Sequence, residues 1–230
     1  MLYSARMPAT DVMPVPGRPP VPIPAIDLAS LLADLAHRGD RLDEAAARHL
    51  GSAVAGTLAG AHATLDEEGD PAAVIHGRLG PEKVRIDVEG AVSVVAAVEG
   101  DTGSAPEVLQ GGRLTPRADV YALGAILAPL LAASADRDLV AALATAIEPH
   151  PGRRRITCVE LEAWLARGAD LDAGRRSLGA AVRSCLARRE RSAAASWSRP
   201  LSAPARAFVT LVTAAAVFTA GVAAVERWLR

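Results

Sequence analysis

The stretch VYALGAILAPLLAA, residues 120–133, has no charged side chain on any face of a helix. A helix that is apolar all round must be buried among other elements, so the rest of the domain has to pack around it. The chain has 230 residues, of which 50% are hydrophobic but only 3% are aromatic. Ala, Val and Leu therefore supply most of the apolar mass, which favours a helical core over a β-sandwich. Pro129 should kink this helix or end it early.

Other segments predict further helices around the buried one. Leucines at helical spacing predict a helix over 27–38, and a longer one is expected over 42–65. Another should cover 137–147, and TCVE at 157–160 has the form of a capping box that opens a helix. Between the second helix and the buried one, KVRID and AVSVVAA are short β-like runs that predict a hairpin. The predicted fold class is therefore mainly α, with one small β-hairpin.

The two ends of the chain differ from this middle part. Residues 1–25 are rich in proline, which favours an extended, disordered lead-in over regular structure. Residues 169–206 predict a basic helix followed by a linker, because Gly174 to Arg206 contains eight Arg and one acid.

Residues 207–225 contain no charged side chain over 19 residues. About 20 apolar residues cross a bilayer as a helix, so a single-pass transmembrane helix with a short tail at 226–230 is expected. The arginines before it place the N-terminal side in the cytoplasm, at the cytoplasmic (inner) membrane. A buried core helix is the alternative for this segment. In one interpretation these arginines only set the topology. In the other they also attract anionic lipid headgroups.

The ionisable side chains exclude several kinds of site. Cys158 and Cys185 are too few and too widely spaced for a disulfide framework or a zinc site, and no metal or cofactor is expected. Lys83 is the single lysine, and the chain contains no asparagine. Any mechanism that needs a second lysine or an asparagine is therefore excluded. The arginine-rich stretch has too few interleaved aromatic residues to favour nucleic-acid binding.

Five sequence strings, in order, resemble the C-terminal lobe of bacterial Ser/Thr protein kinases. They are AGAHA (59–63), VIHGRLGPEKVRID (74–87), APEVL (105–109), ADVYALGAIL (118–127) and HPGRRRITCVELEAWL (150–165). The resemblance implies a kinase-like C-terminal lobe over 26–168, in a family whose overall class is α+β. It begins after the nucleotide-binding lobe, and 25 proline-rich residues cannot form that lobe's sheet. The N-terminal lobe is therefore expected to be absent.

The resemblance also shows what the chemistry would require. Protein kinases use an Asp and an Asn in the catalytic loop and an Asp-Phe-Gly triplet that holds magnesium. Here the catalytic Asp position is Arg78 and the Asn position is Lys83. The triplet falls on Ala96, Ala97 and Val98. The resemblance thus implies a catalytically inactive pseudokinase that does not bind nucleotide.

Four other residues match framework positions of the family. His76 matches the loop histidine, and Asp119 matches the helix aspartate that bonds the loop backbone. Glu107 matches the acid of a buried ion pair, whose arginine is either Arg154 or Arg155; the spacing favours Arg155. The segment between Ala96 and Pro106 is too short for the usual substrate platform.

The favoured function is a membrane-anchored scaffold in signalling that binds a protein partner, such as a kinase. The alternatives are a Ser/Thr kinase remnant whose ATP-binding lobe is missing or supplied elsewhere, and a degenerating gene product. Without an N-terminal lobe, the first two helices should expose an apolar face, and exposed apolar patches often bind partners. Leu28, Leu31 and Leu58 are predicted to form that face.

Overall fold

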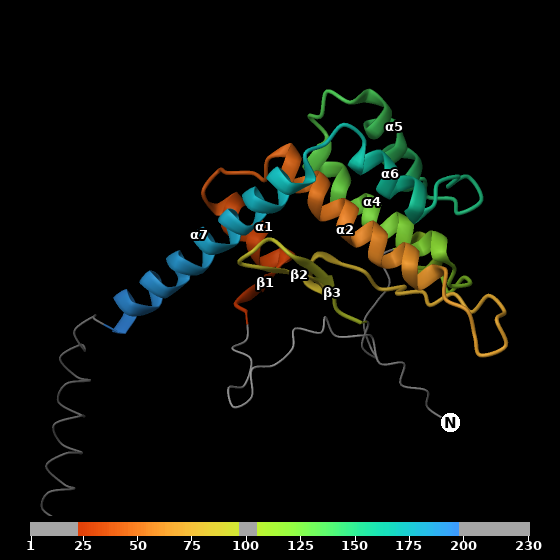
Figure 1. The fold of residues 1–230 in the computed structure, drawn as a ribbon, viewed down its shortest axis with the longest axis horizontal. Coiled ribbons are helices and arrows are strands. Elements are labelled where there is room, and N and C mark those ends of the chain that lie inside the picture. Colours follow the sequence, from red (N-terminus) through yellow and green to blue (C-terminus); the bar gives the residue numbers. More distant parts are fainter. Residues whose placement is uncertain (1–22, 97–104, 198–230) are drawn as a thin grey trace, which may run out of the picture. The chain divides into compact units, whose positions relative to one another are not determined.

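The structure, a computed structural model, describes residues 23–96 and 105–197. Its elements follow one another along the chain (Figure 1). They are β1 (Ala25–Asp27), α1 (Leu28–His37), α2 (Glu44–His62), the 3-10 turn η1 (Pro81–Lys83), β2 (Val84–Asp87), β3 (Val92–Val94), α3 (Pro106–Leu109), α4 (Pro116–Leu131), α5 (Arg137–Ala146), α6 (Cys158–Ala166) and α7 (Leu171–Trp197). The chain divides into two compact units, 1–185 and 186–230. The described part of the second unit is the end of α7.

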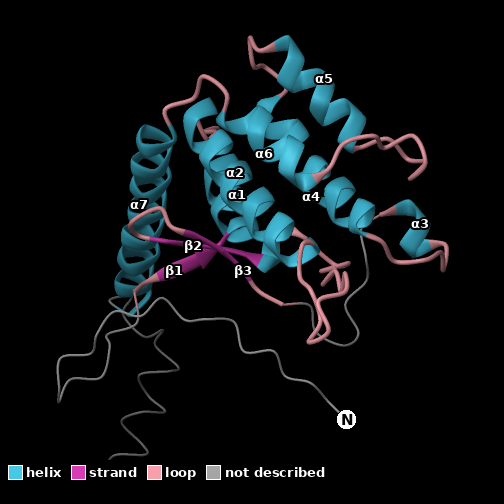
Figure 2. Ribbon diagram, turned by 45° about the vertical axis from the view of Figure 1, so that its right-hand side comes forward, coloured by secondary structure: helices cyan, strands magenta, loops and turns pink. Residues whose placement is uncertain are grey.

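The core of the first unit is built around α2 and α4. The predicted all-apolar helix is α4, and its residues from Ala118 to Leu127 are largely buried. It continues through Pro129 to Leu131, so the proline ends the helix only two residues later. On one side α4 contacts α2 and on another α5, while α6 packs on α2 and α5 (Figure 2).

Gly51 allows α2 to approach its neighbours closely. A Cβ at this position would lie 2.7 Å from Leu127 Cδ1 on α4 and 3.0 Å from Leu165 Cδ1 on α6. A side chain at this position would therefore require the Leu127 and Leu165 side chains to shift where the three helices meet.

Side-chain caps define the starts of several helices. Asp27 accepts a hydrogen bond from Ser30 N at 2.8 Å at the start of α1. Asp43 accepts one from Ala46 N at 2.7 Å at the start of α2. The capping box predicted for TCVE is present, since Thr157 and Glu160 bond each other's backbone at the start of α6. These caps satisfy N–H groups that have no partner inside the helix.

The β-structure is larger than the single hairpin predicted. β2 and β3 form that hairpin, but β1 also pairs with β2 in antiparallel register, with Ile26 opposite Ile86. Ala25 belongs to this strand, so the proline-rich lead-in ends earlier than residue 25. The strand has three residues and directly precedes a helix, so it is too short to show the alternation by which a strand is recognised.

The predicted partner face is wrong because the chain covers it. Leu28 and Leu31 are fully buried, and Leu58 is 2% exposed. β1, β2 and η1 pack against α1, and β3 packs against α2. The three-stranded sheet thus occupies the side of the two helices that was expected to be open.

The first part of α7, up to Cys185, packs on the rest of the first unit through glycines. A Cβ at Gly174 would lie 2.2 Å from Ala45 O of α2, and one at Gly179 would lie 2.9 Å from Val88 O. Gly90, with φ of 79°, meets Arg175 O in the same way. These backbone contacts let α7 pack against the start of α2 and the β2–β3 turn.

Several predictions concern residues that the structure does not describe. The lead-in over 1–22, the segment 207–225 and the tail at 226–230 lie outside the described residues. Within the described ranges, the search for a helix with the length and hydropathy of a membrane span found none.

Candidate functional site

The buried carboxylate of Asp119 holds the loop between α2 and η1 through hydrogen bonds from the loop backbone. Asp119 lies in the first turn of α4 and is fully buried. Its Oδ2 accepts a hydrogen bond from His76 N at 2.9 Å, and its Oδ1 accepts one from Gly77 N at 2.6 Å. The contact that the resemblance predicts between this aspartate and the loop backbone is therefore present. A carboxylate that accepts two backbone N–H groups fixes the loop on the core.

His62 completes this anchor, and the sequence interpretation missed its role. It is the last residue of α2, and its Nε2 lies 2.8 Å from Asp119 Oδ2. One carboxylate thus joins α2, α4 and the loop. The string AGAHA, in which His62 sits, matched the family only as a string, and nothing in it indicated which side chain faces the core.

The ring of His76 links the same loop to the end of β3. Its Nε2 lies 2.8 Å from the carbonyl oxygen of Val95, which can only accept, so this nitrogen donates. Its Nδ1 accepts from Arg78 N at 3.3 Å. Both nitrogens of a neutral imidazole are thereby used to position backbone, which agrees with the structural role predicted for His76.

The backbone of Arg78, Lys83 and Ala96 lies close to this point. Arg78 and Lys83 are both partly buried, at the two ends of the loop that leads through η1. Val95 N donates to Lys83 O at 2.8 Å, while Val95 O accepts from His76. Ala96 comes directly after Val95 and is exposed. Ala97 and Val98 lie outside the described residues.

Arg78 and Lys83 carry positive charge at the positions that the resemblance assigns to a catalytic aspartate and a metal-binding asparagine. A guanidinium has five N–H donors and no acceptor, and an ammonium has three donors and none. Alanine offers only a methyl group. The side chains of Arg78, Lys83 and Ala96 therefore include no carboxylate or amide oxygen.

A buried ion pair anchors α3, and its arginine is Arg154. Arg154 Nη1 lies 2.8 Å from Glu107 Oε1, and Nη2 lies 3.2 Å from Oε2. The guanidinium is 1% exposed and also donates to the carbonyl oxygens of Arg117 and Glu148. The hydrogen bond from Arg154 lowers the pKa of Glu107, against the opposing effect of burial.

The preference for Arg155 as the partner of Glu107 is wrong. Arg155 is exposed. The turn after α5 closes with Arg153 N donating to His150 O and Arg154 N donating to Pro151 O. This turn directs the second of the three consecutive arginines into the core. Counting residues after Pro151 could not show the turn, because each arginine is chemically the same.

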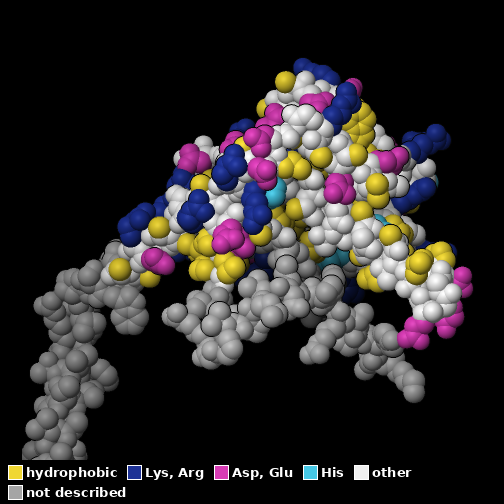
Figure 3. Space-filling view, in the orientation of Figure 1, with side chains coloured by type: hydrophobic (Ala, Val, Ile, Leu, Met, Phe, Trp, Pro, Cys, Tyr) yellow, Lys and Arg dark blue, Asp and Glu magenta, His cyan; other side chains and the backbone are white. Residues whose placement is uncertain are grey.

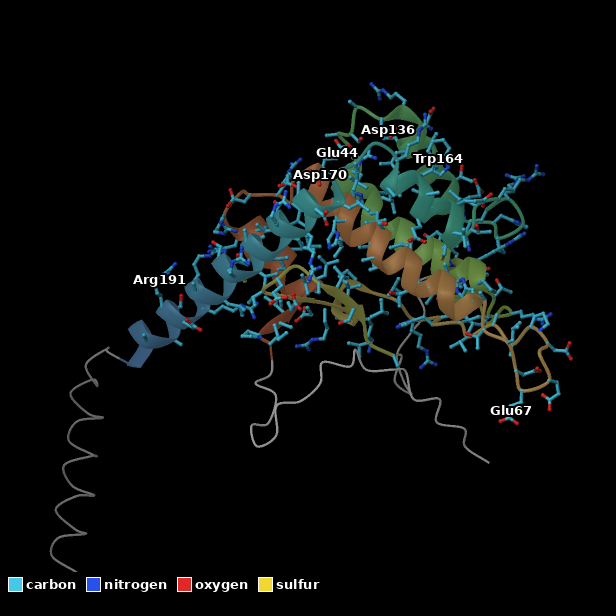
Figure 4. The ribbon with its side chains drawn as sticks, in the orientation of Figure 1. Glu44, Glu67, Asp136, Trp164, Asp170 and Arg191 are labelled. Carbon is cyan, nitrogen blue, oxygen red and sulfur yellow. The ribbon has the colours of Figure 1, made fainter. Side chains whose placement is uncertain are left out.

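A second buried cation was not predicted. Arg48, on α2, is 6% exposed, and it bonds Glu44 Oε1 at 2.8 Å and Asp136 Oδ2 at 3.1 Å. It also donates to Arg167 O at 3.2 Å. Figure 4 shows Glu44 and Asp136 together near the start of α2. This cluster joins α2, α5 and α6 at the end of α2 opposite His62, so it is a structural contact away from the loop.

The cysteines do not form a reactive site. Cys158 and Cys185 are both free and buried. Burial raises the pKa of the Cys158 thiol to about 12, and the nearby Asp119 carboxylate acts in the same direction. The thiol therefore stays protonated and is a poor nucleophile.

The solved structures similar to this chain are kinase domains. The kinase domain of Mycobacterium tuberculosis PknI is 23% identical, with a TM-score of 0.47, over 61% of this chain and 60% of that one. A second structure of this kinase domain is 21% identical over 72% and 64% of the two chains, with a TM-score of 0.45. A divergent kinase that lacks the glycine-rich loop and regulates membrane ultrastructure of the Toxoplasma parasitophorous vacuole is 18% identical over 71% and 62%, with a TM-score of 0.41.

Each of these similarities is to a protein kinase fold, over part of this chain. The chain spans less than two thirds of the length of these kinase structures. No protein-family model matches the sequence, and no curated protein matches it either. Within the chain itself, the kinase-like arrangement consists of the Asp119 anchor beneath the loop and the Glu107–Arg154 pair beneath α3.

Proposed function

We propose that this protein is a catalytically inactive kinase-like module that acts by binding other proteins. The observation that carries the proposal is the identity of the groups on the loop. Asp119 holds this loop by its backbone and His76 ties it to Val95, yet Arg78 and Lys83 stand at the positions that the resemblance assigns to the catalytic aspartate and the metal-binding asparagine. The hydrogen bonds that position the loop are present, while the side chains at the catalytic positions differ from those of an active kinase.

Phosphoryl transfer at these positions meets two physical obstacles. The base-like residue of a kinase accepts a hydrogen bond from the substrate hydroxyl, and the guanidinium of Arg78 has no acceptor. Magnesium requires oxygen ligands, supplied in this family by carboxylate and amide side chains. The ammonium of Lys83 and the methyl group of Ala96 supply none, and the two cations repel a third.

We further propose that the module is anchored to the cytoplasmic face of a membrane. Support comes from the sequence of the C-terminal region, where eight arginines precede 19 uncharged residues. The arginine excess would keep the kinase-like domain in the cytoplasm. Anchoring would concentrate the module near partners at the same surface, which is how a scaffold without activity contributes to signalling.

Nucleotide binding gives the test of inactivity. The full chain is heated with and without ATP and magnesium, each at millimolar concentration, while unfolding is monitored. A ligand that binds the folded state raises the melting temperature by mass action, so an inactive module should melt at the same temperature in both conditions. A rise that depends on ATP concentration and disappears in Lys83→Ala would contradict the proposal.

A further inference from the structure

Four arginine side chains gather around the start of α4 and the turn before α6. This basic patch consists of Arg113, Arg117, Arg153 and Arg155, all of them exposed. Arg117 Nη1 donates to Pro151 O at 2.7 Å, which fixes the start of α4 beside the turn. None of the four forms an ion pair within the described residues. The patch is therefore a positive surface that the described part of its own chain leaves uncompensated.

An acidic loop follows α2 at the same end of the first unit. It carries Asp66, Glu67, Glu68 and Asp70, and all four are exposed. The Asp66 carboxylate accepts from Glu68 N at 3.1 Å and from Asp70 N at 2.8 Å, and a bridge between Leu65 and Pro71 closes the base of the loop. These contacts give the backbone of the loop a defined shape.

Large apolar side chains are exposed beside these charges. Leu65 and Val74 flank the acidic loop and are 58% and 55% exposed. Leu109 and Leu114 flank the segment between α3 and α4 and are 64% and 41% exposed. Leu114 also lies against Gly77, because a Cβ there would be 2.8 Å from its Cδ1. Exposed apolar side chains bordered by charges are the composition of a protein interface, with an apolar centre and a charged rim.

The backbone contacts bring these three features to one end of the first unit. Val74 N donates to Ala61 O at 2.9 Å, which ties the base of the acidic loop to the end of α2. His62 and Asp119 join the end of α2 to the start of α4, beside the basic patch. In Figure 3, acidic side chains gather at the lower right, where Figure 4 labels Glu67, and Lys or Arg side chains lie above them on the same side.

We propose that this end of the molecule binds a second copy of the chain. The acidic loop of one copy contacts the basic patch of the other, and a two-fold axis makes the same contact twice. The exposed leucines and Val74 meet near the axis and are removed from water. Charge complementarity gives the orientation, while the apolar contact supplies the non-directional attraction. This association does not depend on the inactivity proposed above.

The first measurement is sedimentation of the full chain, in density-matched detergent or in buffer. At about 50 mM salt the protein should form dimers, and the dimers should dissociate as salt reaches about 500 mM, because exposed charges are screened. A protein that is monomeric at every concentration and at low salt would overturn the proposal.

Charge reversal identifies the surfaces. The acid-reversed variant carries Glu67→Lys with Glu68→Lys, and the base-reversed variant carries Arg153→Glu with Arg155→Glu. Each variant alone should dimerise at least about tenfold more weakly, since like charges face each other in both contacts. An equimolar mixture should recover dimers, because each loop then meets a patch of opposite charge. Dimerisation of either variant at the wild-type level, or failure of the mixture to associate, would overturn the proposal.

A matched control lies at the opposite end of α2. Arg41 and Arg137 are exposed and lie near the Arg48 cluster, far from the acidic loop. Arg41→Glu with Arg137→Glu makes the same change in net charge as the base-reversed variant and should leave dimerisation unchanged. Equal loss in this control would assign the salt effect to net charge and would overturn the assignment of the two surfaces. Circular dichroism melting of every variant checks that each remains folded.

Discussion

The loop after α2 has an inner side, held by Asp119 in the core, and an outer side, which carries Arg78 and Lys83. The residues on the two sides contribute differently to folding. On the inner side, Asp119 is fully buried and accepts hydrogen bonds from two backbone N–H groups. On the outer side, Arg78 and Lys83 are partly buried, and Ala96 is exposed. Buried polar groups must be satisfied for the fold to be stable, whereas outer positions can change with little effect on folding. The residues that hold the loop in place are therefore different from those at the positions that the resemblance assigns to catalysis.

The largest expected effect on stability comes from placing a charged side chain in the buried core of the first unit. Leu31 is fully buried beneath the small sheet, so Leu31→Glu buries a carboxylate without a partner. That costs several kcal/mol, comparable to the whole stability of a domain, and the first unit should fail to fold. The control is Ala33→Glu, at an exposed position of the same helix. A cooperative thermal transition for Leu31→Glu near that of the wild type would show that the sheet does not cover this face.

The Asp119 anchor can be compared directly with the outer side of the loop. Asp119→Ala leaves the N–H groups of His76 and Gly77 without their acceptor, and we expect a loss of about 3 kcal/mol or more in the free energy of unfolding. Arg78→Ala should change it by about 1 kcal/mol or less. Urea denaturation measures both. Equal losses of unfolding free energy in the two variants would contradict the expectation that Asp119 contributes more to folding than Arg78.

The arginine turn offers a second comparison between neighbours in sequence. Arg154→Met removes the buried partner of Glu107 and leaves several carbonyl oxygens without a donor, so a loss of about 3 kcal/mol is expected. Arg155→Met removes an exposed side chain and should change stability by about 0.5 kcal/mol or less. If urea denaturation gave the reverse order, the pairing of Glu107 with Arg154 would be incorrect.

The smallest expected effect is on the pH dependence of stability. The hydrogen bond from Arg154 lowers the pKa of Glu107 in the folded protein from its ordinary value of 4.5. Its contribution is therefore present at neutral pH and is lost as the pH falls below about 4.5 and through the folded value. Glu107→Gln should be less stable at pH 7 and should lose less stability on acidification. Urea denaturation at pH 7 and pH 3.5 measures this loss in the two proteins. An equal loss of unfolding free energy in the wild type and in Glu107→Gln would contradict this assignment.

The sequence predicted the helices and the loop anchor because both have strong local or ordered patterns. The all-apolar run could only be a buried helix, and Asp119 lies within a string that matches the family residue by residue. Thr157 and Glu160 likewise had the spacing of a cap.

Three features were beyond sequence reasoning for physical reasons. β1 is stabilised by pairing with a strand about 60 residues away, and local pattern does not report such long-range pairing. The burial of Leu31 depends on that same strand. The choice of Arg154 over Arg155 depends on one turn whose backbone hydrogen bonds are invisible in a run of identical residues.

Transfer of phosphate from ATP tests the central claim most directly. The purified full chain, freed of contaminating kinases, is incubated with γ-labelled ATP and magnesium or manganese, with and without a general protein substrate. An inactive protein should give no labelled product above the level of a heat-denatured control. Labelling that persists through purification and is abolished by Arg78→Ala would contradict it, because Arg78 would then take part in the chemistry that its charge is proposed to prevent.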